Sequence, residues 1–349
     1  MSAPRLYFRL PRDLQIKNGG VSFLCFCLFF SLVVLAGPGF GQTTVRSKLK
    51  VPYSSFGPGL VPLWMAKDKG LFARQQLDVE LLYIATSPTI IQTMLSGEVQ
   101  LSSSGQEAAM GANLAGGDIV IIATGVDRPS FFLFTIPEIT KVEQLKGRRL
   151  GISRAGSSTD FAMRFLLQKY GLNPKKDVRL VPTGGIPKAP AAMQAGVIEG
   201  ALLSPPITLR ARKLGFRELL DPEAIGFPFY SASVTARKSW LDSQPDLARR
   251  FIKAYVEAIA AIHKDKPSTL QVIAKYTKEK EPEGLEEGYR VLQKSLPRVP
   301  EPSLDAIRMG LNILAETKPE AASADPSRFI DTRFVRELKQ SGYIDSLYK

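Results

Sequence analysis

Serine-rich loops follow several of the strands that the sequence predicts. Four such loops are Ser54-Ser55-Phe56-Gly57, Ser102-Ser103-Ser104-Gly105, Gly156-Ser157-Ser158-Thr159 and Leu203-Ser204-Pro205. Their hydroxyl groups can donate or accept hydrogen bonds. Backbone N–H groups at the start of a helix favour a carboxylate, sulfonate or phosphate. The loops therefore suit non-covalent binding of a small polar or anionic molecule.

Two of these features have a second interpretation. Ser158 or Thr159 can act as the N-cap of the following helix, and capping does not prevent contact with a ligand. Phe56 and Trp64 can stack on a ligand, but Trp64 lies on the apolar face of a predicted helix and fits the core equally well.

The chain has little equipment for acid-base or nucleophilic catalysis. Its one histidine, His263, lies near the end of a predicted helix beside Lys264, where a cation favours the helix dipole. Its two cysteines, Cys25 and Cys27, both lie in an apolar N-terminal run. These counts exclude a His/Cys metal cluster and disfavour a Ser-His-Asp triad. We predict no catalytic residues, no metal and no cofactor, although two carboxylates could still meet in space.

Alternating strand-like and helix-like segments must position the loops. Strands are expected at residues 49–53, 79–84, 99–103, 119–123, 149–152, 178–181 and 201–203, and helices at 60–69, 88–96, 106–115, 159–170 and 187–195. Short connections between such segments predict a parallel α/β sheet in each half of the chain. Both halves place a serine after a helix–Gly–strand element, as in residues 94–104 and 193–204.

Helical patterns dominate after residue 241. Ser243 and Asp246 resemble a capping box, and Leu247, Phe251 and Tyr255 begin an apolar helical stripe. Further helices are expected at residues 268–276, 283–296, 303–316 and 331–340.

The N-terminus predicts export. Basic residues precede an apolar run at residues 21–36, and the small-residue exit Gly39-Phe40-Gly41 follows it. This pattern is typical of a signal peptide covering residues 1–41, and an uncleaved anchor is the alternative. The net charge of +13 comes from scattered residues and does not predict a nucleic-acid partner.

Several motifs together resemble one family. Residues 62–72, Pro-Leu-Trp-Met-Ala-Lys-Asp-Lys-Gly-Leu-Phe, precede Leu77-Asp78-Val79. Residues 145–152 lead to Gly156-Ser157-Ser158, and residues 193–200 form a helix–Gly–strand element. In this order they resemble ABC transporter solute-binding proteins of the nitrate/sulfonate/thiamine-precursor (SsuA/TauA-like) family, over most of residues 48–265.

The resemblance implies a periplasmic-binding-protein-like fold of the second type, an α/β fold with two lobes joined by a hinge and C-terminal helices. Lobe one would comprise residues 48–135 and 226–349, and lobe two residues 136–225. The lobes would cross near residues 132–137 and 225–231. The family's usual loop contacts correspond to Ser55, Ser104, Ser157 and Ser204, and the loops add Phe56, Gly105 and Ser158 as predicted ligand-binding residues.

The implied function is capture of a small molecule by hinge closure, and its delivery to an ABC permease with its ATPase. The protein would be periplasmic or extracytoplasmic, monomeric and without enzymatic activity. Two alternatives stay open: an enzyme of the same fold in cofactor-precursor biosynthesis, and a ligand-sensing receptor without transport.

Overall fold

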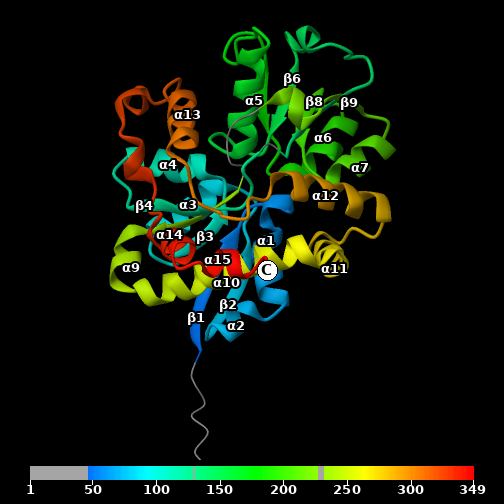
Figure 1. Ribbon diagram of the computed structural model, residues 1–349. Helices are drawn as coiled ribbons and strands as arrows, with labels where there is room; N and C mark the ends of the chain where they lie inside the picture. The colour runs from blue at the N-terminus through cyan, green and yellow to red at the C-terminus, as the bar shows by residue number, and fades with distance from the viewer. Residues whose placement is uncertain (1–45, 129, 227–231) are drawn as a thin grey trace, which may run out of the picture. The chain divides into compact units, whose positions relative to one another are not determined.

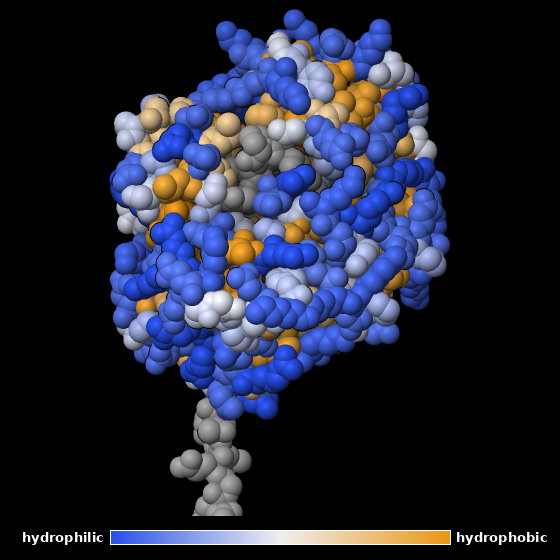
Figure 2. Space-filling view, in the orientation of Figure 1, coloured by the Kyte–Doolittle hydropathy of each residue, from blue (hydrophilic) through white to orange (hydrophobic). Residues whose placement is uncertain are grey.

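A computed structural model describes residues 46–128, 130–226 and 232–349 (Figure 1). The predicted signal segment, with Cys25 and Cys27, lies outside the described residues. Residues 45–349 form one compact unit. Across the described ranges, no helix has both the length and the apolar character needed to cross a membrane. The face in Figure 2 is mainly hydrophilic.

The first lobe is built on a five-stranded sheet with the order β2-β1-β3-β10-β4. β1 runs parallel to β2 and β3, whereas β10 is antiparallel to β3 and β4. The strands are β1 (Ser47–Tyr53), β2 (Leu77–Tyr83), β3 (Leu101–Ser104), β4 (Ile119–Thr124) and β10 (Ser233–Arg237).

The second lobe contains a sheet with the order β7-β6-β8-β5-β9. β6 is parallel to β7 and β8, and β5 is antiparallel to β8 and β9. Its strands are β5 (Phe132–Thr135), β6 (Arg149–Ile152), β7 (Arg179–Pro182), β8 (Gly200–Leu203) and β9 (Arg217–Leu220).

Both sheets are mixed, so the prediction of two parallel sheets was wrong. The antiparallel members are β5 and β10, the strands by which the chain enters each sheet after leaving the other. A helical crossover within one sheet forces a parallel partner, and a strand arriving from another lobe has no such constraint.

Helices cover the sheets, and the chain after β10 is mainly helical (Figure 1). They are α1 (Val61–Asp68), α2 (Leu71–Arg74), α3 (Ser87–Leu95), α4 (Gln106–Leu114), α5 (Ser158–Lys169), α6 (Ala189–Gln194), α7 (Ile207–Lys213), α8 (Pro222–Ile225), α9 (Lys238–Ser243), α10 (Pro245–Lys264), α11 (Lys266–Thr277), α12 (Pro282–Ser295), α13 (Leu304–Leu314), α14 (Arg333–Gln340) and α15 (Tyr343–Ser346).

The amphipathic helix α10 packs on the first lobe through the predicted stripe. Phe251 and Tyr255 are completely buried, and Leu247 is partly buried against the same core. The predicted capping box does not form. α10 begins at Pro245, and its N-cap is Gln244, which makes no side-chain capping bond.

The chain passes between the lobes earlier than the sequence suggested. β5 lies in the second sheet, so the first passage falls between Thr124 and Phe132 instead of at residues 132–137. The lobe boundary predicted at residue 135 was therefore wrong, because Phe132–Thr135 pairs with β8. The return passage was expected at residues 225–231, and residues 227–231 of it lie outside the described part of the chain.

Two C-terminal helices pack against both lobes. On α12, Val291 joins a core cluster of the second lobe, and Leu292 joins the core of the first. On α13, Ile307 belongs to a cluster that also contains Met110 of α4 and Phe161 of α5. The C-terminal helices therefore connect the lobes, and do not belong to lobe one alone as predicted.

Candidate ligand-binding site

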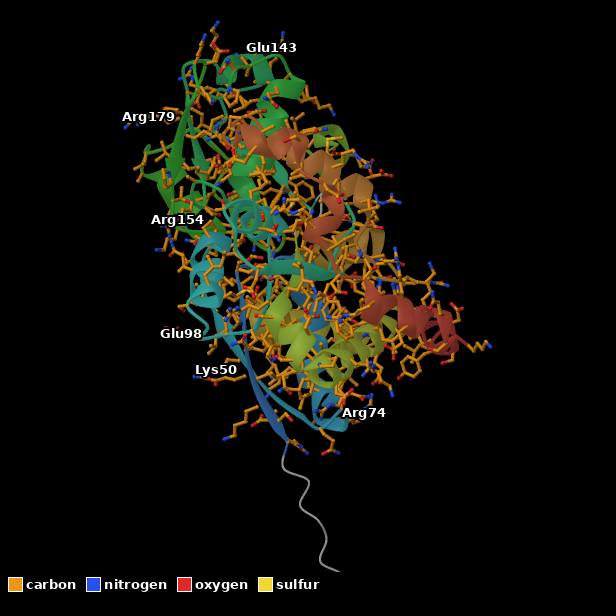
Figure 3. The ribbon with its side chains drawn as sticks, turned by 90° about the vertical axis from the view of Figure 1, so that its left-hand side faces the viewer. Lys50, Arg74, Glu98, Glu143, Arg154 and Arg179 are labelled. Atoms are coloured by element: carbon orange, nitrogen blue, oxygen red, sulfur yellow. The ribbon has the colours of Figure 1, made fainter. Side chains whose placement is uncertain are left out.

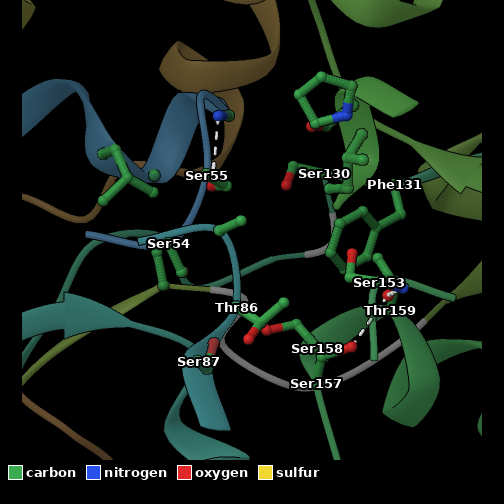
Figure 4. A pocket seen from close by; sticks show the side chains of 18 residues that line it. Ser54, Ser55, Thr86, Ser87, Ser130, Phe131, Ser153, Ser157, Ser158 and Thr159 are labelled. Carbon is green, nitrogen blue, oxygen red and sulfur yellow. Dashed lines mark hydrogen bonds between the residues drawn. The ribbon is translucent and has the colours of Figure 1, made fainter. Parts of the chain in front are cut away.

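One cavity is formed jointly by loops of both lobes (Figure 4). Ten of its eighteen lining residues are serine or threonine, and none is charged. The space inside is about 40 Å³, enough for a group of a few non-hydrogen atoms. The lining residues are Ser54, Ser55, Gly57, Gly59, Leu60, Ala85, Thr86, Ser87, Ser130, Phe131, Ser153, Ser157, Ser158, Thr159, Ile186, Pro187, Ser204 and Ala232.

Most of the polar lining follows the carboxyl ends of parallel strands. Ser54 and Ser55 follow β1, Ser153 follows β6, and Ser204 follows β8. In open α/β sheets, ligands bind at this edge because the strands end there and the connecting loops converge. The cavity therefore lies at the sheet edge to which this rule points, and its use as the ligand site stays a prediction.

The start of α5 faces the cavity without a side-chain cap. Ser157 is the N-cap residue, but its hydroxyl instead accepts a hydrogen bond from the Arg154 N–H at 3.3 Å. The Thr159 hydroxyl accepts from the Ser153 N–H at 2.7 Å. Neither Ser158 nor Thr159 is the N-cap residue, and the N-cap side chain makes no capping bond. The first N–H groups of the helix therefore donate no hydrogen bond to a capping side chain.

The start of α3 in the first lobe is a second helix N-terminus without a side-chain cap at the cavity. Its N-cap, Thr86, makes no side-chain capping bond, and the hydroxyls of Thr86 and Thr89 lie 2.8 Å apart. Thr86 and Ser87 line the cavity. One helix N-terminus from each lobe therefore adds positive potential to a cavity without formal charge.

The structure places four of the seven predicted ligand-binding residues at the cavity: Ser55, Ser157, Ser158 and Ser204. Their contact with a ligand remains a prediction. Ser204 and Ser157 are buried, and Ser55 and Ser158 are partly exposed.

The other three predicted residues are not among the lining residues. Phe56 packs on Tyr83, with ring centroids 4.4 Å apart. Ser104 is the last residue of β3 and is buried opposite Ser233 of β10. Gly105 lies behind the lining, where its N–H donates to the Ser87 hydroxyl at 3.0 Å.

Trp64 belongs to the core of the first lobe. Its side chain is completely buried and stacks on Tyr276 with ring centroids 5.0 Å apart. Of its two interpretations, core packing is the one that the structure supports.

His263 is not among the lining residues, and it lies in the last turn of α10 as predicted. Its Nδ1 lies 3.2 Å from Oε1 of Gln293, and burial lowers the pKa of the imidazole. This lowered pKa disfavours the charged imidazole that the predicted role at the helix end requires. Within the described ranges, no group of three His, Cys, Asp or Glu side chains is placed to hold a metal ion.

Several lining residues were missed in the sequence. Thr86 and Ser87 follow β2 as polar residues at a helix start, so the rule used for the other loops could have found them. Ser130 and Phe131 lie on the passage between the lobes, which was assigned to a later segment. The sequence analysis also missed Glu107, which is not a lining residue but contacts one: its carboxyl group accepts a hydrogen bond from the Ser158 hydroxyl at 2.9 Å.

Comparison with known proteins agrees with this architecture. The family model described as NMT1/THI5-like matches residues 58–268, more than half of the chain. The chain belongs to the NMT1/THI5-like family. YtlA of Bacillus subtilis (strain 168) is 23% identical to this family member over 246 residues, which are 68% of this chain and 72% of YtlA.

Solved structures share the fold of this NMT1/THI5-like protein. The periplasmic nitrate-binding protein NrtA from Synechocystis PCC 6803 aligns with a TM-score of 0.69 at 16% identity, covering 87% of this chain and 91% of NrtA. The alkanesulfonate-binding protein SsuA from Xanthomonas axonopodis pv. citri, bound to MOPS, aligns with a TM-score of 0.65 at 17% identity, covering 80% and 96%. The predicted periplasmic-binding-protein-like fold is thereby confirmed.

Proposed function

We propose that this protein is an exported, monomeric solute-binding protein, without enzymatic activity, that delivers its ligand to an ABC importer. The observation that carries the proposal is the cavity shared by the two lobes. Its walls contain hydroxyl groups and two uncapped helix N-termini, but no titratable side chain. Such walls can bind and release a molecule, whereas acid-base catalysis needs a titratable side chain and a serine nucleophile needs an adjacent base, and the lining residues include neither.

The proposed ligand is small and carries an anionic or strongly polar group. N–H groups at helix starts and serine O–H groups can all donate to its oxygen atoms. The named relatives support this choice, since one is a nitrate-binding protein and another an alkanesulfonate-binding protein. Capture would proceed by closure of the lobes around the ligand, as in hinge-type domain closure.

Native mass spectrometry of protein purified without dialysis is the direct test, because it identifies a retained ligand. Thermal unfolding with nitrate, sulfonates, pyrimidines and aromatic carboxylates follows. A ligand at 100 times its Kd should add about 2.7 kcal/mol to the free energy of unfolding. Turnover of any of these compounds would overturn the proposal in favour of an enzyme.

Removing one cavity hydroxyl should weaken binding of such a ligand. We expect Ser157→Ala to raise the Kd about tenfold, which corresponds to one lost hydrogen bond of about 1.4 kcal/mol. Isothermal titration with the identified ligand measures this change. Ser323→Ala, at an exposed serine outside the cavity, is the matched control. Equal affinities of both variants and the unmodified protein would remove Ser157 from the site.

A further inference from the structure

Glu107 links the two lobes directly behind the cavity lining. It is the second residue of α4 in the first lobe and is 1% exposed. Its Oε1 accepts a hydrogen bond from the hydroxyl of Ser158, the first residue of α5 in the second lobe. Ser158 lines the cavity, so the carboxyl group orients a residue of the candidate site from across the lobe boundary.

The absence of a side chain at position 105 permits this contact. A Cβ atom there would lie 2.1 Å from both Glu107 Oε1 and Ser158 Oγ. The backbone of Gly105 has ordinary extended dihedral angles, so glycine is not required for its conformation. Its small size is what lets the carboxyl and hydroxyl groups meet.

Burial disfavours a negative charge on this carboxyl group more strongly than its hydrogen bonds favour one. Its Oε2 is buried without a hydrogen-bond partner among the described residues. Burial raises the pKa of Glu107 to about 7, and the negative charge of Asp160 adds to this rise. The backbone N–H at the start of its own helix and the hydrogen bond from Ser158 both lower the pKa, but by less than burial raises it.

Charged groups on the packed elements do not neutralise it. Asp160 of α5 is paired with Arg164 at 2.8 Å. On α13, Arg308 pairs with Asp305 at the exposed surface, and Arg237 of β10 pairs with Asp118. The segments α3 and β4 carry no charged residue, and α4 carries none besides Glu107.

We propose that Glu107 is a positioning residue that couples closure of the lobes, and hence ligand capture, to uptake of one proton. The proposal rests on the proposed function. In the closed arrangement the protonated carboxyl accepts from Ser158 and stays buried. When Glu107 ionises, the charge must be hydrated, and separation of the lobes supplies water.

The sign of the effect follows from linkage. A carboxyl group whose pKa is higher in the closed form than in the open form takes up a proton on closing. Closure and affinity therefore increase as the pH falls through about 7 towards the ordinary range of a glutamate. We expect the Kd of an anionic probe to be roughly thirtyfold higher at pH 8 than at pH 5.5, because a carboxyl group with a pKa of about 7 in the closed form and an ordinary glutamate pKa in the open form takes up almost one proton on closing over most of this range.

Distance measurement between spin labels tests closure without a ligand. Glu98 and Arg179 are exposed on the two lobes, and Figure 3 shows both on one side of the molecule with Arg154 between them. Labels at Glu98→Cys and Arg179→Cys, in a chain with Cys25→Ser and Cys27→Ser, report the separation. The separation should increase between pH 5.5 and pH 8 in the otherwise unmodified chain.

Two variants separate the coupling from a merely structural role. Glu107→Gln keeps an acceptor for Ser158 but cannot ionise, so the separation should stay short at every pH. Gly105→Ala should displace the two oxygens and lengthen the separation even at pH 5.5. Glu143→Gln, at an exposed residue, should behave like the unmodified chain. A separation independent of pH, or a pH dependence that survives in Glu107→Gln, would overturn the proposal.

Titrations with nitrate and ethanesulfonate distinguish this proposal from the proposed function. If either probe binds with the same Kd at pH 5.5 and pH 8, the coupling through Glu107 is wrong, while the binding function stands. If neither probe binds but the label separation still depends on Glu107, the coupling stands and the choice of anionic ligands is wrong.

Discussion

Replacement of Trp64 with alanine should lower the free energy of unfolding by about 4 kcal/mol. The indole is completely buried in the first lobe, where it stacks on Tyr276 and lies edge-on to Tyr53. Removing it deletes a large apolar surface and leaves a cavity that neighbouring rings fill only in part. The buried indole N–H has no partner among the described residues, so its loss offsets a small part of this cost.

Urea unfolding followed by circular dichroism measures the effect. Trp240→Ala is the matched control, because the second tryptophan is only partly buried against the same core and should cost less. Ligand affinity at a temperature where both variants are folded should match that of the unmodified protein. A weaker affinity for Trp64→Ala together with little loss of stability would restore the interpretation that Trp64 stacks on the ligand.

Arg212→Ala should destabilise the protein by about 3 kcal/mol. Arg212 of α7 pairs with Glu287 of α12 at 2.6 Å and with Glu218 at 2.6 Å. The carboxyl group of Glu287 is 5% exposed, and it also accepts from the Thr208 hydroxyl at 2.6 Å. Without the guanidinium, this carboxylate would be buried with one neutral hydrogen-bond donor. Loss of one partner of a buried ion pair costs more than the pair contributes.

Lys213→Ala is the control for this prediction. Lys213 is the next residue of α7 and pairs with Glu281, but both side chains are more than half exposed. Exposed pairs contribute little, so the urea midpoint of Lys213→Ala should stay near that of the unmodified chain. If Arg212→Ala also unfolds at the unmodified midpoint, Glu287 must be reached by water, and the contact of α12 with the second lobe does not depend on this ion pair.

Much of the secondary structure could be predicted because it depends on local patterns. The residues expected at 106–115 and 159–170 form α4 and α5 within one residue at each end. Sheet direction could not be predicted in this way. It depends on how distant segments pair, and the pairing of β10 with β3 joins residues more than 100 positions apart.

In the candidate site, too, the features that depend on local sequence could be predicted and those that depend on distant contacts could not. The serine loops were found because polar residues after buried strands mark the edge where ligands bind. Which side chains of a loop face the cavity was not predictable, since adjacent residues point in different directions. Ser55 lines the cavity, whereas its neighbour Phe56 is held by Tyr83, a residue of the next strand. Glu107 was missed because its burial depends on contact between two lobes.

The uncharged walls of the cavity have a consequence for selection among ligands. A ligand that enters loses its hydration shell and gains hydrogen bonds from serine hydroxyls and helix N–H groups. No side chain of opposite formal charge lines the cavity to offset the free energy lost on dehydration. The cost of dehydration then dominates the balance, so anions that hold water weakly bind better than compact, strongly hydrated ones of similar shape. Such a cavity ranks its ligands by how easily they leave water.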